Sequence, residues 1–245
     1  MLSVTRSLLL SLSLSVAAVT TAATAQDPVV AFPKNYSIAL DNSAVTVIRV
    51  HYGPHEHVGV HDHSAFSTIY VYLSDSGPVH FTHDENPPFE VTRPPAVKGN
   101  FRVSPGRKER HSVDNLGDKS SDFLRVELKQ LPLDGSGLEE FRGKAPTGPL
   151  HSGDTVEFHS TSFDIERIIC EAPAPCTIKA SDTPSLLIAL SPVTMTDASH
   201  HAVPIDDGGI KWLQGSQPVS VASASAVPAH LLRVVLKSPQ SKPAQ

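Results

Sequence analysis

The sequence has few charged residues and little that favours helices. Asp, Glu, Lys and Arg make up 18% of its 245 residues, below the share of about a quarter that is usual in soluble globular proteins. Proline is abundant instead, with 21 residues, and no segment shows helical spacing of apolar residues over helix length. Because helix-rich proteins carry more charge and less proline, this balance favours β structure.

A strong net charge and a long apolar run are also lacking. The formal net charge of −5 is too small to indicate nucleic acid or an anionic membrane surface as a partner. The hydrophobic share of 40% is ordinary, which excludes a polytopic membrane protein and a largely disordered chain. The apolar stretch at residues 7–20 is too short to span a bilayer, which takes about twenty residues.

Residues 1–25 have the pattern of a secretory signal peptide. Arg6 precedes the apolar stretch, and small residues at 23–25 (Ala-Thr-Ala) form a cleavage site. A short N-terminal anchor helix is the alternative reading. We therefore expect a secreted or periplasmic protein with no membrane span after processing.

Cysteine is scarce, with only Cys170 and Cys176, which five residues separate. An oxidising compartment would let them pair, and they lack the C-x-x-C spacing of a redox-active pair. The sequence therefore predicts a local structural disulfide, whose effect on stability is modest because the loop it closes is short.

Short apolar runs with a period of two dominate the rest of the chain. They are rich in Val, Ile, Leu and Tyr and are bounded by Gly, Pro, Asp and Ser, which predicts strands. The expected fold class is all-β.

Four of these runs recur in the same order in the second half. Residues 45–50 correspond to 163–168, and residues 123–129 correspond to 231–237, where five of seven residues are identical. The offset falls steadily, as one unit with shorter loops in its second copy would give. We expect one barrel at 30–130 and a second at 151–238. The Gly-, Pro- and Ser-containing segment at 131–150 is expected to be a linker.

Histidine is also unusually abundant, and it is clustered. Five of the 13 His fall within thirteen residues: His51, His55, His57, His61 and His63. On a strand, His61 and His63 project from the same face, because side chains alternate with a period of two. Two imidazoles so placed can bind one divalent transition metal ion, with a further ligand from a neighbouring strand. The ligand type leaves Fe, Mn, Ni, Cu and Zn open.

At these residues the first half resembles a cupin. The first cupin motif is HxH followed by a Glu and a glycine turn, and His61, His63 and Gly77 match it in part. The second motif is a glycine, five residues, a proline, then a glycine, a His and, four residues later, an Asn. Its positions are occupied by Gly99, Pro105, Gly106, His111 and Asn115.

The resemblance implies two cupin-like double-stranded β-helix (jelly-roll) barrels in tandem. It also implies a metal ion inside the first barrel, held by His61, His63 and His111, and a structural role for Asn115. One position departs from the family, because Ser67 or Thr68 stands where the metal-binding Glu is expected.

The missing Glu leaves the ligand set open. His55 and His57 have the strand parity of His61 and His63, so either is a candidate additional ligand. An alternative register takes His55 and His57 as the HxH pair with His61 in the Glu position, but it misaligns the following strand by six residues. A His-rich surface loop that binds zinc or copper loosely is a further alternative.

The other histidines match no motif. We expect His80 and His83 to face solvent. We expect the remainder to be ordinary surface residues: His151, His159, His200, His201 and His230. In the second half the positions equivalent to the ligands fall at 178–181 and 219–221, where no metal ligand stands. That half is expected to be a barrel without a metal.

Two classes of function remain. A metal ion that is bound by three histidines and has open coordination positions suits a mononuclear metalloenzyme. Such an enzyme would be dioxygenase-like or isomerase-like and would act on a small polar molecule. A non-catalytic metal- or small-ligand-binding protein of the cell envelope fits the same fold, because fold does not determine function. No catalytic residue is assigned, and the oligomeric state is left open, a homodimer included.

Overall fold

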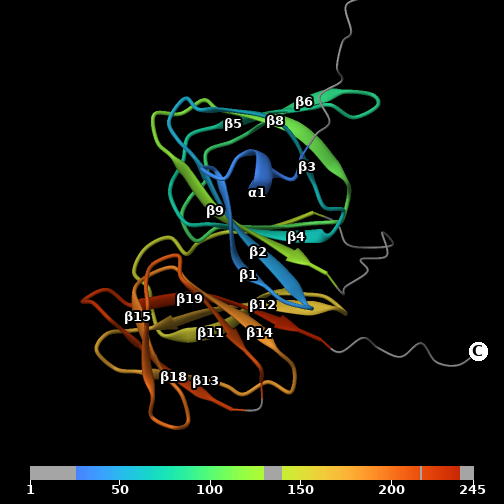
Figure 1. The fold of residues 1–245 in the computed structure, drawn as a ribbon. Coiled ribbons are helices and arrows are strands. Elements are labelled where there is room, and N and C mark those ends of the chain that lie inside the picture. The colour runs from blue at the N-terminus through green and yellow to red at the C-terminus, as the bar shows by residue number, and fades with distance from the viewer. Residues whose placement is uncertain (1–25, 130–139, 216, 238–245) are drawn as a thin grey trace, which may run out of the picture.

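The computed structural model describes residues 26–129, 140–215 and 217–237. These residues form two β barrels and one short helix (Figure 1), which confirms the all-β fold class. The predicted signal peptide at 1–25 lies outside the described residues. Among the helices of the described ranges, none is long and apolar enough to cross a membrane.

The first barrel is built from two antiparallel sheets, with strand orders β1-β2-β9-β4-β7-β10 and β3-β8-β5-β6. Its elements are α1 (Pro28–Ala31), β1 (Tyr36–Asp41), β2 (Val45–Tyr52), β3 (His57–His63), β4 (Ser67–Tyr72), β5 (Val79–His83), β6 (Phe89–Arg93), β7 (Phe101–Ser104), β8 (Glu109–Asn115), β9 (Ser121–Leu128) and β10 (Phe141–Gly143). Helix α1, which Asp27 caps through a hydrogen bond to the Val29 amide, lies at the mouth of this barrel (Figure 1).

The second barrel repeats this arrangement. Its elements are β11 (Gly153–His159), β12 (Phe163–Cys170), β13 (Cys176–Ile178), β14 (Ser185–Ala189), β15 (Val193–Thr196), β16 (Ala202–Ile205), β17 (Ile210–Leu213), β18 (Val219–Ser223) and β19 (Ala229–Leu236). The sheet orders are β11-β12-β19-β14-β17 and β13-β18-β15-β16. Apart from β10, each order is that of the first barrel with ten added to every strand number, so the sequence repeat is a repeat of topology.

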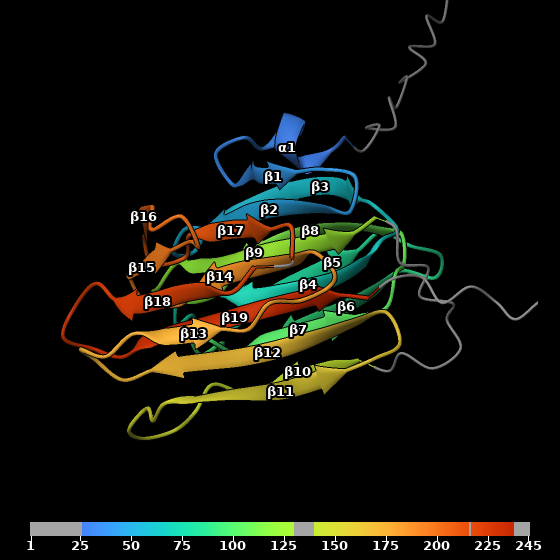
Figure 2. The same ribbon diagram turned by 90° about the horizontal axis from the view of Figure 1, so that it is seen from below.

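The two larger sheets pack face to face and share one core. Figure 1 shows β2, β4 and β9 above β12, β14 and β19, and in Figure 2 these strands run in similar directions. Side chains alternate along β9, so Leu124 and Val126 enter the shared core while Phe123 and Arg125 face the interior of the first barrel. The part of the cavity wall that β9 carries is therefore buried on both faces.

Part of the segment expected to be a linker is a strand. Residues 130–139 lie outside the described residues, but β10 pairs with β7 and extends the sheet of the first barrel. The ring of Phe141 lies 5.8 Å from that of Phe101 and 5.1 Å from that of Phe158, measured between centroids. Burial of this ring between the two barrels favours an extended, paired backbone, which the Gly and Pro content of the segment did not indicate.

Two local predictions hold in the structure. Cys170 and Cys176 form a disulfide that links the end of β12 to the start of β13. The side-chain amide of Asn115 donates hydrogen bonds to the carbonyls of Tyr52, Gly53 and Lys119, and its oxygen accepts one from the Gly117 amide. Asn115 therefore ties the end of β2 to the segment between β8 and β9, which is a structural role.

Candidate metal centre

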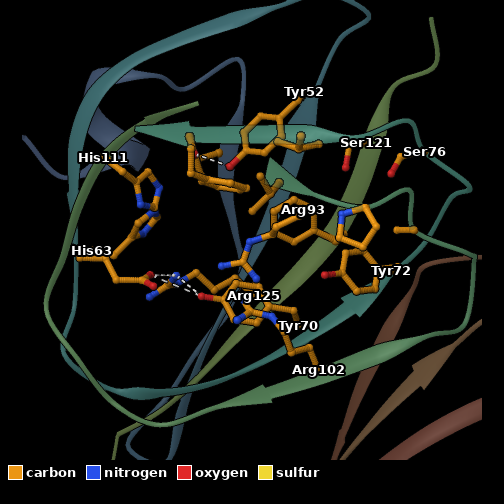
Figure 3. Close-up of a pocket in the computed structure, with 18 residues that line it drawn as sticks. Tyr52, His63, Tyr70, Tyr72, Ser76, Arg93, Arg102, His111, Ser121 and Arg125 are labelled. Carbon is orange, nitrogen blue, oxygen red and sulfur yellow. Dashed lines mark hydrogen bonds and ion pairs between the residues drawn. The ribbon is translucent and has the colours of Figure 1, made fainter. Parts of the chain in front are cut away.

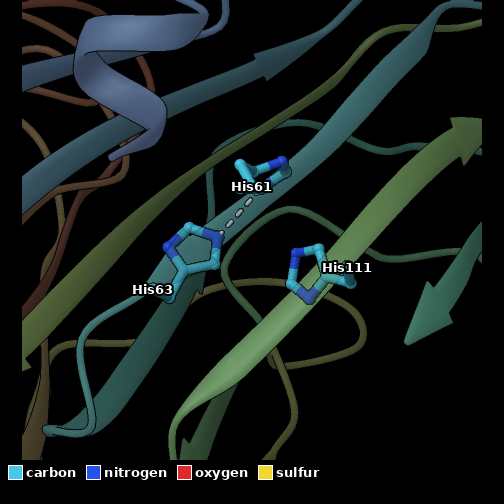
Figure 4. A group of neighbouring side chains, drawn as sticks. All are labelled: His61, His63 and His111. Carbon is cyan, nitrogen blue, oxygen red and sulfur yellow. Dashed lines mark hydrogen bonds between the residues drawn. The ribbon is translucent and has the colours of Figure 1, made fainter. Parts of the chain in front are cut away.

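Three histidines meet inside the first barrel (Figure 4). His61 and His63 extend from β3, and His111 extends from the neighbouring β8, where it is in register with His61. One nitrogen from each ring lies within 4.8 Å of the others, and all three side chains are buried. The structure thus brings together the three residues that the sequence indicated as metal ligands.

The surroundings of His61 decide which of its nitrogens faces this cluster. Nδ1 lies 2.8 Å from the carbonyl oxygen of Gly59, which can only accept a hydrogen bond, so Nδ1 carries the proton and Nε2 the lone pair. Nε2 lies 2.9 Å from the hydroxyl of Tyr36 and 3.1 Å from Nε2 of His63. A hydrogen bond from the far nitrogen to a carbonyl is a common way to orient a metal-binding imidazole.

The other two rings carry nitrogens that no protein group satisfies. Both nitrogens of His111 and Nδ1 of His63 are buried and have no hydrogen-bond partner in the described protein. Each such atom costs about 1–3 kcal/mol, and a group of them in one place calls for an explanation such as a bound ion. A divalent cation held by lone pairs of the three rings fits this donor set.

Burial keeps the three imidazoles neutral. It is the largest cause that lowers the pKa of His61, and it lowers the pKa of His63 well below its usual value. Burial, followed by the electrostatic repulsion that the protonated form of His61 would exert, lowers the pKa of His111 to about 2. Since a metal binds the neutral form of imidazole, the three rings are in the ligating form at neutral pH.

The two candidate additional ligands do not join the cluster. His55 and His57 are exposed, and each pairs with an aspartate at the surface. Nε2 of His55 lies 2.8 Å from Asp118, and Nδ1 of His57 lies 2.7 Å from Asp114. The parity argument fails for His57 because the register of β3 shifts between Val58 and His61. A bulge of this kind turns the following residues to the opposite face.

His83 was expected at the surface, and the structure places it inside. Its side chain is 1% exposed, and its ring stacks on Phe89 with centroids 4.2 Å apart. The centroid of His111 is 5.1 Å away, because the two residues are paired between β5 and β8. The apolar residue Phe81, two positions earlier on the same face, was a signal for this burial. His80, on the opposite face of β5, bonds the hydroxyl of Thr92.

The expectation for His230 was also wrong. This residue of β19 is 9% exposed, and its Nε2 accepts a hydrogen bond of 2.7 Å from Arg167. Burial, followed by the charge of Arg167, lowers its pKa to about 4. Arg167 also donates to the carbonyl of Gly99 in the first barrel, so His230 belongs to a contact between the barrels. The other four histidines without a motif are exposed as expected: His151, His159, His200 and His201.

A cavity of about 40 Å³ adjoins the histidines (Figure 3). His63 and His111 line one side of it. The rest of its wall combines small and aliphatic residues with aromatic, basic and acidic ones, which include Tyr36, Tyr52, Tyr70, Phe81, Arg93, Arg102, Glu109, Phe123 and Arg125. A volume of this size holds about three water molecules, so a ligand that fits without rearrangement is small.

A buried ion cluster in this wall was not found from the sequence. Arg125 donates hydrogen bonds to the Tyr70 hydroxyl at 2.7 Å, to Glu109 at 3.0 Å and to Glu127 at 2.9 Å. Burial is the largest single influence on the pKa of Glu109 and would raise it, but the charge and hydrogen bond of Arg125, with the interactions of His111 and Arg107, together outweigh burial and lower the pKa to about 2. Glu109 precedes His111 by two residues on β8, so strand parity was a signal that the two share a face.

The positions where the cupin pattern has its Glu do not supply a ligand. Ser67 and Thr68 are buried on β4, outside the group of residues that could hold a metal. The hydroxyl of Thr68 donates to the carbonyl of Phe66 at 3.0 Å. The site is therefore a cluster of three histidines.

Strand register identifies the matching positions in the second barrel. Ile178 pairs with Val219 between β13 and β18, as His61 pairs with His111 between β3 and β8. Both apolar residues belong to a buried cluster. In the described part of the second barrel, no group of side chains could hold a metal ion.

No family model matches this sequence, and no curated protein matches it either. The fold is similar to several solved structures. AerE from Microcystis aeruginosa has a TM-score of 0.57 and 11% identity, over 83% of this chain and 98% of AerE. The pirin YhhW from Escherichia coli, solved in complex with nickel(II), has a TM-score of 0.57 and 13% identity, over 83% and 91% of the two chains.

Oxalate decarboxylase from Bacillus subtilis is a third similar structure. Its TM-score is 0.54 and its identity 12%, over 80% of this chain and 69% of the decarboxylase. Another structure of that enzyme was solved in work on its Mn(II) centres. At these identities the similarity concerns the fold alone. Together with the repeated strand order, it shows that this chain has the bicupin fold.

Proposed function

We propose that the first barrel binds one divalent transition metal ion through His61, His63 and His111. One observation carries the proposal: three buried, neutral imidazoles converge, and several of their nitrogens have no partner in the described protein. Structures of the same fold with nickel(II) or Mn(II) support it. Imidazole donors suit several transition metals, so the ligands do not select among Fe, Mn, Ni, Cu and Zn.

We further propose that the protein is a mononuclear metalloenzyme that oxidises or isomerises a small polar molecule. Three protein ligands leave coordination positions open, and a bound ion would supply Lewis acidity or a position for dioxygen there. The side chains next to the histidines would orient the substrate. Glu109 is ionised and accepts hydrogen bonds, whereas burial raises the pKa of Tyr36, which keeps its hydroxyl as a donor.

A non-catalytic binding protein is the second candidate. The observation that favours it is the state of Glu109, the one carboxylate among the described residues of the cavity wall. Its low pKa makes it a weak base at neutral pH. For either function we propose export to the periplasm or the medium, which rests on the signal-peptide pattern of residues 1–25.

Metal content tests the site. The full chain is expressed and purified without added metal. Its metal content is then measured by elemental (inductively coupled plasma) mass spectrometry. We expect one ion per chain in the wild type and in His57→Ala, and little in His61→Ala or His111→Ala. His57 is the matched control because it lies on the same strand but faces solvent. Variable stoichiometry that His111→Ala leaves unchanged would contradict the site.

Turnover separates the two functions. Oxygen uptake and product formation are followed with small diols, diketones, carboxylic acids and thiols. Turnover that requires the metal and disappears in His111→Ala supports the enzyme. Saturable binding of one of these compounds without any conversion supports the binding protein.

A further inference from the structure

Three arginines surround one aromatic ring in the cavity wall. The guanidinium carbons of Arg102, Arg125 and Arg93 lie 4.0, 5.4 and 6.0 Å from the ring centre of Tyr70. They come from three different strands, β7, β9 and β6, and Figure 3 shows Arg93 and Arg102 in the part of the cavity wall farther from the histidines. Like charges gathered in this way repel one another unless anions lie between them.

Protein carboxylates are hydrogen-bonded to only one of the three arginines. Arg125 is hydrogen-bonded to Glu109 and Glu127. Arg93 and Arg102 donate no hydrogen bond to any residue that the structure describes, and Nε of each is buried without a partner. Arg102 forms one long ion pair. Its Nη1 lies 3.8 Å from Oε2 of Glu140, whose side chain is 41% exposed.

A guanidinium group whose N–H donors lack hydrogen-bond partners is costly to bury. Arg102 is 4% exposed, and burial, followed by the charge of Arg102, lowers the pKa of Arg93. A guanidinium group offers five N–H donors in a planar fork, and a buried cation without a partner loses hydration that nothing replaces. Both side chains therefore have the capacity to bind an oxyanion.

A groove gives access to these arginines from outside. It has a volume of about 550 Å³ and shares Arg93, Arg102 and Glu109 with the cavity. The two walls carry five arginines: Arg93, Arg102, Arg107, Arg125 and Arg142. Four glutamates pair with them: Glu140 with Arg142, Glu85 with Arg107, and Glu109 and Glu127 with Arg125. The excess is one positive charge, and Arg93 forms no ion pair with a carboxylate of the described residues. This local positive excess contrasts with the net charge of −5 for the chain, and such an excess raises the local concentration of anions.

We propose that Arg93 and Arg102 bind the carboxylate group of a compact anionic substrate, which enters through the groove and lies beside the histidines. This names the substrate class of the proposed metal site and so rests on the proposed function. A carboxylate matches the guanidinium fork with two parallel hydrogen bonds. The rings of Phe81 and Phe123 in the same wall suit the uncharged part of a small organic acid. Inorganic phosphate would use the same donors and is the competing ligand.

Titration of the full chain with acetate, acetamide and inorganic phosphate, at constant ionic strength and followed by NMR, tests the proposal. The titrations are made with and without added metal. Acetate is expected to bind and acetamide, its uncharged analogue, is not. Hydrogen bonds to a charged group are worth about 1.5–3 kcal/mol, so Arg93→Gln is expected to weaken acetate binding about tenfold or more.

Two further variants make the result specific. Arg142→Gln removes the same charge from the groove, but its side chain is 58% exposed and lies outside the set around Tyr70, so acetate binding stays within about twofold. Arg93→Lys keeps the charge without the fork and is expected to fall between wild type and Arg93→Gln. Thermal melting shows whether Arg93→Gln is folded. If it is not, Arg93→Lys provides the test.

Equal losses in Arg93→Gln and Arg142→Gln would overturn the proposal, and so would binding of phosphate without acetate. Failure of this inference is distinct from failure of the metal site. A chain that holds metal but no acetate refutes the arginine subsite alone. A chain that binds acetate through Arg93 but holds no metal refutes the proposed metal site and leaves the subsite.

Discussion

The two barrels have the same strand order and register but opposite interiors. In the first, the paired positions on the smaller sheet are His61 and His111, and in the second they are Ile178 and Val219. On the larger sheets, Tyr70 pairs with Arg125 as Leu187 pairs with Arg233. One topology thus accommodates either a polar cavity or an apolar core. The choice lies in a few inward-facing side chains.

The difference in interior gives the two barrels different roles: the first holds the polar cavity, and the second contributes stability. An apolar interior gains free energy from burial without any partner, whereas buried histidines, arginines and glutamates cost free energy unless they are paired. The second barrel also covers the outer faces of β2, β4 and β9 through the shared core. It therefore supports the strands that carry the cavity wall of the first.

The largest effect is expected from a charge in the shared core. Leu232 is fully buried between the barrels, so Leu232→Asp should cost about 5 kcal/mol, because an unpaired carboxylate loses its hydration there. Urea unfolding measures the loss, and metal content should fall with it although the change lies in the second barrel. Val227→Asp is the control, since Val227 is 54% exposed. A folded Leu232→Asp chain that keeps its metal would show that the barrels are independent.

Arg125 and Arg233 occupy equivalent positions in the two barrels, so replacing each of them compares the stability of a polar with an apolar interior. Arg125→Met leaves Glu127 buried and unpaired, and it leaves Glu109 with Arg107 at 3.5 Å as its remaining cation, which should cost about 3 kcal/mol. Arg233→Met should cost less, because its partner Glu166 is 19% exposed and reaches water. Urea denaturation of both variants gives the difference. Adding Glu109→Gln to Arg125→Met should restore part of the stability, and equal losses for the two arginines would contradict the assignment.

Acid should destabilise both barrels through buried neutral histidines. The folded pKa of His230 is about 4, below its usual value of 6.5. The unfolded chain therefore binds the proton first, and stability that is present above pH 6.5 is lost as the pH falls toward 4. Each pKa unit corresponds to about 1.4 kcal/mol, so the contribution of His230 is about 3 kcal/mol.

Stability measured against pH checks this contribution. His230→Gln keeps an acceptor for Arg167 but does not titrate, so its stability should fall less than that of the wild type between pH 6.5 and 4. His159→Gln, at an exposed position, should follow the wild type. A His230→Gln profile identical to that of the wild type would disprove the buried neutral state.

Metal removal should affect the first barrel alone. At a free metal concentration of 100 times Kd, binding adds about 2.7 kcal/mol to the free energy of unfolding. A chelator should therefore lower the melting temperature of the wild type but not of His111→Ala. Amide hydrogen exchange should show the change in β3 and β8 and not in β13 and β18. Equal changes in the two sheets would break the comparison between the barrels.

Several of these features could be predicted from the order of residues. The period-two runs and their repetition predicted two β barrels, because alternation follows from strand geometry alone. The spacing of His61 and His63, and the glycine, proline and asparagine around His111, indicated the ligands through the resemblance to cupins. Cys170 and Cys176 are near enough along the chain for their pairing to be local.

Other features depended on folding. A bulge in β3 turned His57 to solvent, and pairing of β5 with β8 placed His83 beside His111. The contacts of Arg93 and Arg102 with Tyr70 join residues from three strands that are distant in the sequence. Local patterns specify which residues alternate and where turns occur, but burial, pairing and charge balance are properties of neighbours that only the packed barrels bring together.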